Sequence, residues 1–458
     1  MKVTGPKRSA PPPPADPAAR GAAASPSAAR TPRPDGFSGG TPAAPGPLLA
    51  PLPARTVPAL PRFCDPAFEA ALDAATFSRA RPGNNVQLLQ DGAESFPARD
   101  ALIDGAKQSI CLQTFIFDSD ETGWALARRL AQKAKDGVKV RVIYDAVGSQ
   151  RADPALFEHL RQAGVEVRAY GQPWKVWDLN DRWHEKHLVV DGRAAITGGM
   201  NIANEYAYGG SGRAVLSRGK VAEQPWRDVD VKLTGPVVGD AARAFIRNWE
   251  LLGDALPGAD RSALLPRLSP APGGHRVRLV QADPEAETAG RTTALYLEAI
   301  RHARRSITLE NAYFVPPEEV RTALVEAARR GVEVRVLTNS RASTDFGVVS
   351  DAGRYFYDAL VHAGVKVYET TGGTLHGKVA TFDGEFSIVG SVNLNGRSAH
   401  QDTEVAAAID DGGTASALVS RFEAGLRQAR QVTAAELEHE GFLANLRQWA
   451  VSSFAWML

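Results

Sequence analysis

From about residue 85 to about residue 430, short apolar runs of period two alternate with longer stretches in which apolar residues recur at helical spacing. Val138–Ile143 and Val332–Leu337 are two such runs, and each has Val at every second position. Period two is typical of β-strands, and the stretches between the runs are long enough for amphipathic helices. Strands that alternate with helices form right-handed β–α–β units. We therefore predict an α/β fold with a mainly parallel or mixed β-sheet flanked by helices.

This alternation occurs twice along the chain. Matching segments follow one another in the same order in the two halves, and they are Val86–Leu89 with Val277–Val280, Ala106–Ile110 with Ala303–Ile307, and Ala163–Val167 with Ala363–Val367. An internal repeat of this length predicts two lobes of similar topology that pack together. A Pro- and Gly-rich break separates the halves. The predicted boundaries are 63–255 for the first lobe, 256–274 for the linker and 275–430 for the second lobe.

Residues 1–62 have a different composition, because they hold 16 of the 30 prolines together with long Ala, Gly and Ser stretches. Such a segment buries too little apolar surface to offset its chain entropy, so we predict a disordered Pro/Ala-rich arm. Eight Lys and Arg against two Asp give the arm a net charge of +6, which leaves −5 for the rest of a chain whose net charge is +1. A basic arm could touch an anionic membrane surface, or it could be a solubilising tail.

Residues 431–458 are predicted to form a C-terminal amphipathic helix. Its apolar stripe consists of Phe442, Leu446, Trp449, Ala450, Ser453 and Trp456/Met457. The stripe could lie in a membrane interface or dock on the folded domain. A second aromatic group, Trp174–Trp177 with Trp183, lies beside cations and suits a lipid-lined mouth, although it could equally pack at the rim of the core.

The composition is that of a soluble globular protein, since 44% of the 458 residues are hydrophobic and 23% are charged. It excludes a wholly disordered chain and the strong basicity of a protein that holds nucleic acid mainly by charge. No run reaches the ~18 apolar residues of a transmembrane helix, and no signal-peptide core follows the basic N-terminus. Two cysteines, Cys64 and Cys111, cannot build a disulfide framework, and Cys111 is expected to be a buried thiol. We expect a cytoplasmic protein.

Both halves also carry one polar motif with identical spacing. The first copy runs from His184-Glu185-Lys186 through Asp191 to Gly198-Gly199-Met200-Asn201, and the second runs from His376-Gly377-Lys378 through Asp383 to Gly390-Ser391-Val392-Asn393. The shared pattern is His-x-Lys-x4-Asp-x6-Gly-[Gly/Ser]-x-Asn. Two copies at matching points of a duplicated unit indicate a shared site rather than a surface accident.

The spacing has a physical meaning. Residues two apart in a strand share a face, so the His and Lys of each copy point together. The Gly-Gly or Gly-Ser step lets the backbone approach a ligand closely and delivers an amide to the same place. Face to face, the copies make a pocket that suits a phosphodiester transition state, and because lysines supply the positive charge we expect no metal. The predicted set is His184, Lys186, Asp191 and Asn201 with His376, Lys378, Asp383 and Asn393.

These copies resemble the paired HKD motifs of the phospholipase D superfamily, and the resemblance covers roughly residues 85–430. It implies two similar α/β lobes with the active site on the pseudo-twofold axis between them. It also implies that one His attacks phosphorus to form a phosphohistidine while the other protonates the leaving alcohol. By analogy we assign His184 as the nucleophile and His376 as the general acid, with the motif lysines and asparagines binding phosphate oxygens. Asp191 and Asp383 belong to the motif but are expected to brace loops, and no cofactor is expected.

Each imidazole also needs an acceptor that orients its far nitrogen. Glu404 lies eleven residues after Asn393, where members of the superfamily often place such a Glu. Asp228 is the equivalent candidate in the first half. The alternative for both is an ordinary carboxylate at the end of a strand.

Further segments are similar to those of bacterial cardiolipin synthases of the type without N-terminal transmembrane helices. They are Asp120–Gly123, Gly198–Ala203, Trp226–Asp228 and Asn393–Ser398. This resemblance implies a phosphatidyltransferase with a phospholipid substrate, which makes cardiolipin from phosphatidylglycerol or a related donor, and peripheral contact with the inner face of the cell membrane. Gly199 departs from the pattern, because many members have Ser there.

Three alternatives remain: a phospholipase D that uses water, a phosphodiesterase acting on nucleic acid, and a non-catalytic scaffold. The acidic folded part and the lack of a basic aromatic stripe disfavour a nucleic-acid partner. Both copies keep His, Lys and Asn, which disfavours a scaffold. We expect a monomer.

Overall fold

A computed structural model describes residues 63, 65–171, 182–209, 215–217, 220–222, 226–272, 274–284 and 288–452, and these residues fall within one compact unit. The predicted arm at 1–62, Cys64, Trp174–Trp177 and the end of the C-terminal stripe from Ser453 onward lie outside the described residues. No helix in the part that the structure describes is long and apolar enough to cross a membrane.

The strands of the first half are β1 (Arg81–Gln90), β2 (Ser109–Thr114), β3 (Lys139–Asp145), β4 (Glu166–Tyr170), β5 (Arg182–Trp183), β6 (His187–Val190), β7 (Ala194–Gly198), β8 (Val215–Ser217), β9 (Lys220–Ala222) and β10 (Val229–Thr234). Those of the second half are β11 (His275–Ala282), β12 (Ser306–Asn311), β13 (Glu333–Asn339), β14 (Lys366–Thr370), β15 (Lys378–Phe382), β16 (Phe386–Gly390), β17 (Asp402–Asp410) and β18 (Ala429–Gln431).

The helices of the first half are α1 (Pro66–Thr76), α2 (Asp91–Gly105), α3 (Glu121–Lys135), α4 (Pro154–Gln162), α5 (Asn204–Ala207), α6 (Val238–Leu251) and α7 (Gly258–Leu264). Those of the second half are α8 (Arg291–His302), α9 (Glu318–Arg329), α10 (Gly347–His362), α11 (Gly396–His400), α12 (Gly412–Leu426), α13 (Ala434–Glu438) and α14 (Phe442–Ser452).

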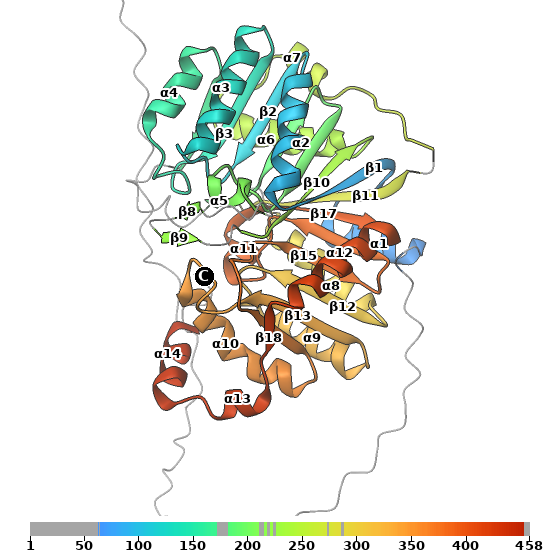
Figure 1. The fold of residues 1–458 in the computed structure, drawn as a ribbon. Helices are drawn as coiled ribbons and strands as arrows, with labels where there is room; N and C mark the ends of the chain where they lie inside the picture. Colours follow the sequence, from blue (N-terminus) through green and yellow to red (C-terminus); the bar gives the residue numbers. More distant parts are fainter. Residues whose placement is uncertain are drawn as a thin grey trace, which may run out of the picture. The chain divides into compact units, whose positions relative to one another are not determined.

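One mixed sheet runs through both halves (Figure 1). From the centre outward, the first half reads β1-β10-β7-β6-β2-β3-β4 and the second reads β11-β17-β16-β15-β12-β13-β14-β18. Counted from the centre, each strand of the first half, from β1 out to β4, matches the strand at the same position in the second half, from β11 out to β14. At the centre, β1 pairs antiparallel with β11. The predicted α/β fold with two similar lobes is therefore confirmed, and the lobes share a backbone hydrogen-bonded seam.

Local sequence explains where the elements begin and end. The carboxylates of Asp120 and Asp153 accept hydrogen bonds from the first turns of α3 and α4, so each caps its helix. Gly137 and Gly331 have φ angles of 88° and 90°, a left-handed conformation that favours glycine. Each stands between a helix and the following Val-rich strand, which is the point where the repeated pattern changes period.

The core lies on both faces of the sheet. β2 and β15 are buried along their whole length, as expected for strands covered by helices on each side. Cys111 of β2 is fully buried, which confirms the predicted buried thiol, and burial raises the pKa of that thiol to about 12.

Three boundary predictions need correction. Phe68 and Leu72 of α1 pack in the core of the second lobe, beside Phe386, so the segment from residue 63 to Thr76 joins that lobe and not the first. The predicted linker contains α7, whose Asp260 pairs with the buried Arg141 of β3. The linker therefore packs against the first lobe, where Asp260 shares the buried Arg141 with Glu166.

The C-terminal segment forms the short helices α13 and α14 rather than one long helix. Arg447 of α14 lies 3.0 Å from Asp351 of α10, and the Gln448 side chain is buried. Leu446 and Trp449 are 45% and 57% exposed. One side of α14 thus docks on the domain while two large apolar side chains face outward.

Of the two alternatives for Trp183, the structure supports packing in the core. This side chain is 2% exposed and stacks on Tyr170 at a ring distance of 4.4 Å. The ring therefore packs between residues of two strands and is not exposed for contact with lipid.

A buried ion pair joins the lobes beside the seam. Arg421 of α12 lies 3.0 Å from Asp91, whose φ of 59° is left-handed, and its guanidinium also lies 3.3 Å from Glu310. Asp91 in turn accepts the backbone N–H of Asp228 at 2.9 Å. A charge from the second lobe therefore fixes the start of a strand in the first.

We expect Asp91→Asn to lower the free energy of unfolding by about 2 kcal/mol, because the buried Arg421 loses one of its two carboxylate partners and keeps only Glu310. Asn tolerates the left-handed backbone, so the change isolates the charge. Urea denaturation measures the effect. The exposed pair of Asp104 and Arg129 supplies the control Asp104→Asn, which should cost at most about 1 kcal/mol. Equal losses in the two variants would contradict the prediction.

Candidate active site

The two lobes exchange backbone partners where the motifs begin. β5, which precedes His184, pairs in parallel with β17 of the second lobe, and the His184 N–H donates to the Thr403 carbonyl at 3.1 Å. In the opposite direction, the His376 N–H donates to the Arg227 carbonyl at 2.7 Å. Each histidine is thus held by the strand of the other lobe, which brings both motifs to the seam.

The same exchange pairs each imidazole with a carboxylate across the seam. His184 Nδ1 lies 3.0 Å from Glu404 Oε1, and His376 Nδ1 lies 2.6 Å from Asp228 Oδ2. Both candidate orienting residues therefore contact a histidine, and each contacts the one from the opposite lobe. Spacing within one half could not show this crossing.

The motif lysines lie beside the imidazoles. The Nζ atoms of Lys186 and Lys378 each donate to the carbonyl of the histidine two residues before, at 2.5 Å. Lys378 Nζ also lies 3.1 Å from His376 Nε2. β6 starts at His187 and β15 at Lys378, so both strands start later than the sequence predicts. Each Lys still contacts the His two residues before it.

The motif asparagines differ in their surroundings. Asn201 accepts from the Ile116 N–H at 3.0 Å and donates to the Tyr206 hydroxyl at 2.9 Å. Asn393 is also buried, but its Oδ1 has no hydrogen-bond partner among the residues that the structure describes. Asn201 is therefore held in place by the protein, whereas the amide oxygen of Asn393 is not.

The motif aspartates stabilise turns. Asp191 accepts from the backbone N–H groups of Lys107, Gln108 and Ser109 at 2.8–2.9 Å, ahead of β2. Asp383 does the same for the residues ahead of β12. Both have left-handed φ angles, 52° and 55°. Each carboxylate is thus occupied at the far end of the strand from its histidine, where it holds a loop in place.

The departure at Gly199 has a steric cause. A Cβ at this position would lie 2.2 Å from Asp228 Oδ1, so only glycine leaves room for the carboxylate that orients His376. In the second copy, the Ser391 hydroxyl instead donates to Glu404, and Ser398 donates to the other Glu404 oxygen at 2.5 Å. The two copies therefore hold their carboxylates in different ways.

Aromatic rings surround the imidazoles. Phe115 meets His184 edge to face at a ring distance of 5.1 Å, and Tyr206 meets His376 in the same manner at 5.1 Å. Trp226 stacks on His376 at 5.3 Å. These rings exclude water from the imidazoles. The sequence analysis included Trp226 only as part of a family segment and did not predict Phe115 or Tyr206. Their positions, directly after a predicted strand and shortly after the first motif, are the signals that could have identified them.

Burial dominates the electrostatics of the site. It lowers the pKa of both His184 and His376 well below the ordinary 6.5, and the positive charges of the two lysines lower them further. It also raises the pKa of Asp228 to about 6 and that of Glu404 to about 7, although the lysines partly offset this rise. At neutral pH both imidazoles are therefore uncharged.

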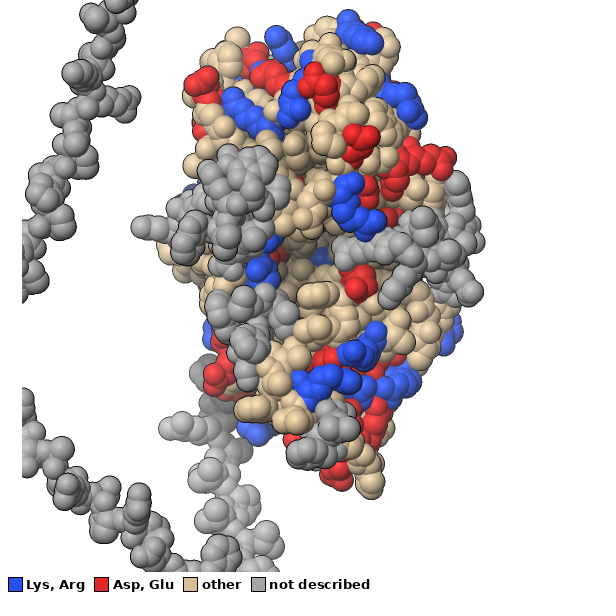
Figure 2. All heavy atoms as spheres, turned by 90° about the vertical axis from the view of Figure 1, so that its left-hand side faces the viewer, with Lys and Arg blue, Asp and Glu red and all other residues tan. Residues whose placement is uncertain are grey.

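The lysines respond to burial in the same way. Desolvation lowers the pKa of Lys186 to about 7 and that of Lys378 to about 8, while nearby carboxylates act in the opposite sense. Among the described residues, no group of three or more His, Cys, Asp or Glu side chains could hold a metal ion. Lys186 and Lys378 both lie within the site, where each can contribute positive charge. Figure 2 shows a hollow between the two lobes, with basic and acidic side chains interspersed around it.

We expect Gly199→Ala to destabilise the fold by about 1–3 kcal/mol, since an added methyl group must displace the Asp228 carboxylate from a packed site. Gly105→Ala is the control, because nothing lies within 4 Å of a Cβ at that position. That change should be neutral or slightly stabilising. Urea denaturation compares the two, and indistinguishable midpoints would show that the space at Gly199 is not required.

Known proteins match the chain over both lobes. The family described as cardiolipin synthase, PLD-like domain, matches residues 100–209 and 296–426. Cardiolipin synthase A of Pseudomonas putida is 35% identical over 362 residues, which cover 76% of this chain and 70% of that protein. A cardiolipin synthase of Geobacillus kaustophilus is 34% identical over 365 residues, covering 79% of this chain and 70% of that one.

A solved structure agrees with the fold. The crystal structure of phosphatidylserine synthase from Haemophilus influenzae covers 85% of this chain and 99% of its own, with a TM-score of 0.66 at 15% sequence identity. The paired motifs, the two-lobed sheet and these relatives lead to the same conclusion. The chain belongs to the cardiolipin synthase family of phospholipase D-like phosphatidyltransferases.

Proposed function

We propose that the protein transfers a phosphatidyl group from a phospholipid to an alcohol through a phosphohistidine, and that it makes cardiolipin from phosphatidylglycerol or a related donor. The observation that carries the proposal is the crossed arrangement of two buried imidazoles, His184 with Glu404 and His376 with Asp228. One phosphorus atom between such imidazoles would have a nucleophile on one side and a proton donor on the other.

His184 is the proposed nucleophile. Its side chain is 10% exposed against 4% for His376, and within the described part of the chain no hydrogen bond occupies its Nε2. Burial keeps the ring neutral, as attack requires, and the carboxylate of Glu404 on Nδ1 keeps the lone pair on Nε2. His376, enclosed by aromatic rings and Lys378, is the better-held general acid.

In the first step, Nε2 of His184 forms a bond to phosphorus as the bond from phosphorus to the head-group oxygen breaks. His376, whose protonated form is favoured by the negative charge of the bound phosphodiester, gives its proton to that oxygen, and the alcohol leaves. In the second step, an incoming alcohol gives its proton to His376 and attacks phosphorus, and the bond to His184 breaks. Both histidines return to their starting forms, so atoms and charges balance.

Lys186 and Lys378 would neutralise the phosphate oxygens. A phosphodiester anion favours the charged form of each buried lysine, so substrate binding would restore positive charge where burial had weakened it. Asn201 and Asn393 are the proposed amide donors to the same oxygens. This arrangement stabilises the extra charge of the transition state in a site from which water is largely excluded.

We also propose that the protein acts as a monomer in the cytoplasm, in peripheral contact with the inner face of the cell membrane. Both histidines and both carboxylates come from one chain, so no second copy is needed to complete the site. The exposed Leu446 and Trp449 on α14 and the net charge of +6 on residues 1–62 support contact with an anionic lipid surface.

A donor with a good leaving group tests the roles of the histidines, because phosphatidyl-p-nitrophenol needs no acid to release nitrophenolate. We expect His376→Ala to release one equivalent per active site and to accumulate a covalent phosphatidyl adduct, which mass spectrometry detects on His184. His184→Ala should release none. With phosphatidylglycerol, both variants should lose at least ~10³-fold in kcat.

Asp104→Asn, a change on the exposed face of α2, serves as the matched control and should keep wild-type turnover. An adduct only in His184→Ala would reverse the two roles, and turnover in either histidine variant would defeat the mechanism. The products that the wild-type protein makes distinguish transfer from hydrolysis. Cardiolipin from phosphatidylglycerol vesicles supports transfer, and phosphatidic acid alone indicates hydrolysis. Release of nucleotides from single-stranded DNA without lipid products would overturn the proposal of a lipid substrate.

Because both motif lysines have lowered pKa values, we expect kcat/KM to fall on the alkaline side of the pH profile. Because burial lowers their pKa values to about 7 and 8, their charge disappears as the pH rises through that range, well below the ordinary value of 10.5. The value of kcat/KM, which reports the free enzyme, should therefore fall above about pH 7. On the acid side, kcat/KM should fall only once the nucleophile His184 protonates, below pH 6.5. Steady-state rates from pH 5 to 10 measure the profile, and a plateau to pH 9.5 would contradict it.

A further inference from the structure

A cavity adjoins the histidine site on the first lobe. Its volume is about 330 Å³, and its lining includes Phe115, Asp118, Ser149, Arg151 and Glu205. A volume roughly ten times the ~30 Å³ that one water molecule occupies in the liquid can hold a three-carbon polyol with some water. The proposed mechanism uses none of the polar side chains in this lining.

One wall of the cavity is shared with the site. The Phe115 ring packs edge to face on His184 and lies 5.4 Å from Lys186 Nζ. Ile116, the next lining residue, is held by the Asn201 amide oxygen at 3.0 Å. Residues that border the cavity therefore contact three members of the first motif, Phe115 through its ring and Ile116 through its backbone N–H.

The cavity floor is tied to the chain that leads into His184. Asp145 Oδ1 accepts the N–H groups of Val147 and Gly148, both in the floor, at 2.9 and 2.8 Å. Its Oδ2 accepts the Trp183 N–H at 3.0 Å, one residue before His184. A single buried carboxylate thus fixes the cavity relative to the imidazole, as a preformed subsite requires.

The opposite end of the cavity lies towards His376. Glu205 borders this end and precedes Tyr206, whose ring packs on His376. The Glu205 carbonyl also accepts the N–H of Trp226, the ring stacked on His376. Attack by His184 puts the departing and entering alcohols on the far side of phosphorus, so this end is where the rest of an alcohol would extend.

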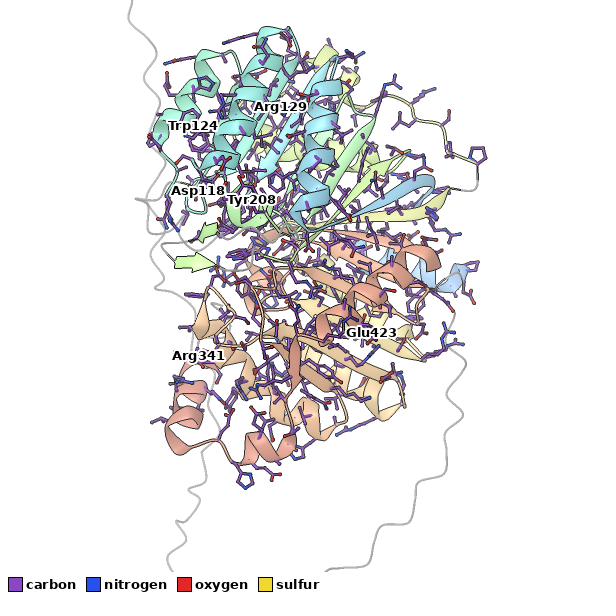
Figure 3. The ribbon with its side chains drawn as sticks, in the orientation of Figure 1. Asp118, Trp124, Arg129, Tyr208, Arg341 and Glu423 are labelled. Atoms are coloured by element: carbon purple, nitrogen blue, oxygen red, sulfur yellow. The ribbon has the colours of Figure 1, made fainter. Side chains whose placement is uncertain are left out.

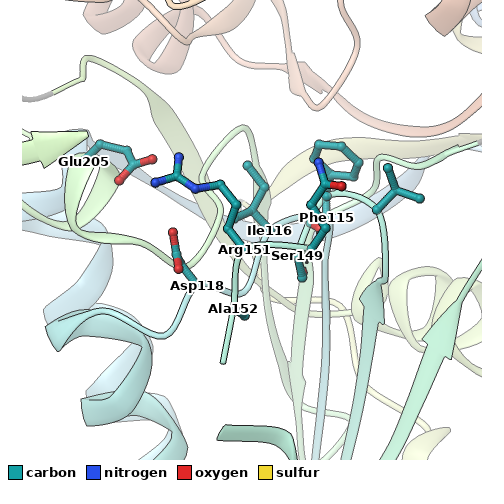
Figure 4. A pocket seen from close by; sticks show the side chains of 10 residues that line it. Phe115, Ile116, Asp118, Ser149, Arg151, Ala152 and Glu205 are labelled. Carbon is teal, nitrogen blue, oxygen red and sulfur yellow. Dashed lines mark hydrogen bonds between the residues drawn. The ribbon is translucent and has the colours of Figure 1, made fainter. Parts of the chain in front are cut away.

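The polar groups at this end suit several hydroxyls. In Figure 4 the Arg151 guanidinium reaches toward the carboxylates of Asp118 and Glu205, with Phe115 at the other end of the cavity. Carboxylates accept hydrogen bonds and a guanidinium donates them, so the group can satisfy a polyol, whose hydroxyls do both. Two carboxylates against one guanidinium leave this group with a net negative charge, which disfavours a second phosphate.

We infer that this cavity is the acceptor subsite and that it binds the polyol part of the incoming alcohol, a glycerol-like group, through Asp118, Arg151 and Glu205. The inference rests on the proposed phosphatidyl transfer and adds to it the residues that bind the acceptor. Asp118 and Arg151 are specificity-determining residues, since they contact the part of the alcohol that does not react.

Competition between acceptors tests the inference. Phosphatidyl-p-nitrophenol serves as donor with glycerol, ethanol or ethanolamine as acceptor, and mass spectrometry measures each transfer product against phosphatidic acid from water. We expect Asp118→Asn and Arg151→Gln each to lower the ratio of glycerol transfer to hydrolysis at least about tenfold, the effect of losing a hydrogen bond to a charged group. The ratio for ethanol, too small to reach the polar end, should stay within about twofold.

The control pair is Asp104→Asn and Arg129→Gln, which alters an exposed carboxylate and guanidinium on α2 and α3. Figure 3 shows Arg129 on the outer helix layer and Asp118 at the edge facing the second lobe. Both control variants should keep the wild-type ratios. Asp118 and Arg151 are not core residues, so their variants should fold, which circular dichroism checks.

Other outcomes of this experiment would overturn the inference in part or in whole. An unchanged glycerol ratio in both cavity variants, with active wild-type protein, would overturn the acceptor subsite and leave phosphatidyl transfer standing. Ethanolamine transfer equal to glycerol transfer would overturn the polyol class. Wild-type protein that forms no phosphatidyl product at all would overturn the proposed function together with the subsite.

Discussion

The crossing of the two imidazole–carboxylate pairs is the constraint on which the rest of the structure depends. His184 is oriented by a carboxylate that belongs to the second lobe, and His376 by one that belongs to the first. Neither lobe contains a complete catalytic unit, so the relative position of the lobes has to be fixed to a fraction of an ångström. The shared sheet provides this rigidity, because β1 and β11 join the lobes through backbone hydrogen bonds at the centre.

This arrangement has an electrostatic cost. Two lysines, two histidines and two carboxylates are buried together, and desolvation pushes each of them toward its neutral form. An anionic ligand in the site offsets this desolvation cost, because a phosphate favours the charged form of the lysines. The same groups therefore weaken the empty protein and prepare it for substrate, a conflict between stability and activity that is common at active sites.

Much of this could be predicted from the sequence. Val at alternate positions marked the strands, and the duplicated order of segments predicted two similar lobes. The long identical spacing from His184 to Asn201 and from His376 to Asn393 singled out the residues that meet at the seam. These features are local or repeated, and a periodic pattern displays them directly.

Other features depend on contacts between distant segments, which no local pattern shows. The crossing of Asp228 and Glu404 needs the relative position of the lobes. The helix at Pro66 joins the second lobe because its Phe68 meets Phe386, more than 300 positions away. The position of Trp183 beside cations in the sequence suits a membrane interface, but in the structure the ring stacks on Tyr170. In each case tertiary packing overrode an interpretation based on neighbouring residues.

The different treatment of the two copies at Gly199 and Ser391 has an evolutionary consequence. An assembly of two identical single-motif chains must carry the same residue at both positions, so glycine on one side would remove the hydroxyl from the other. Joining the halves covalently lifts that restriction. One half can then specialise in forming a covalent bond and the other in moving protons, without a compromise imposed by symmetry.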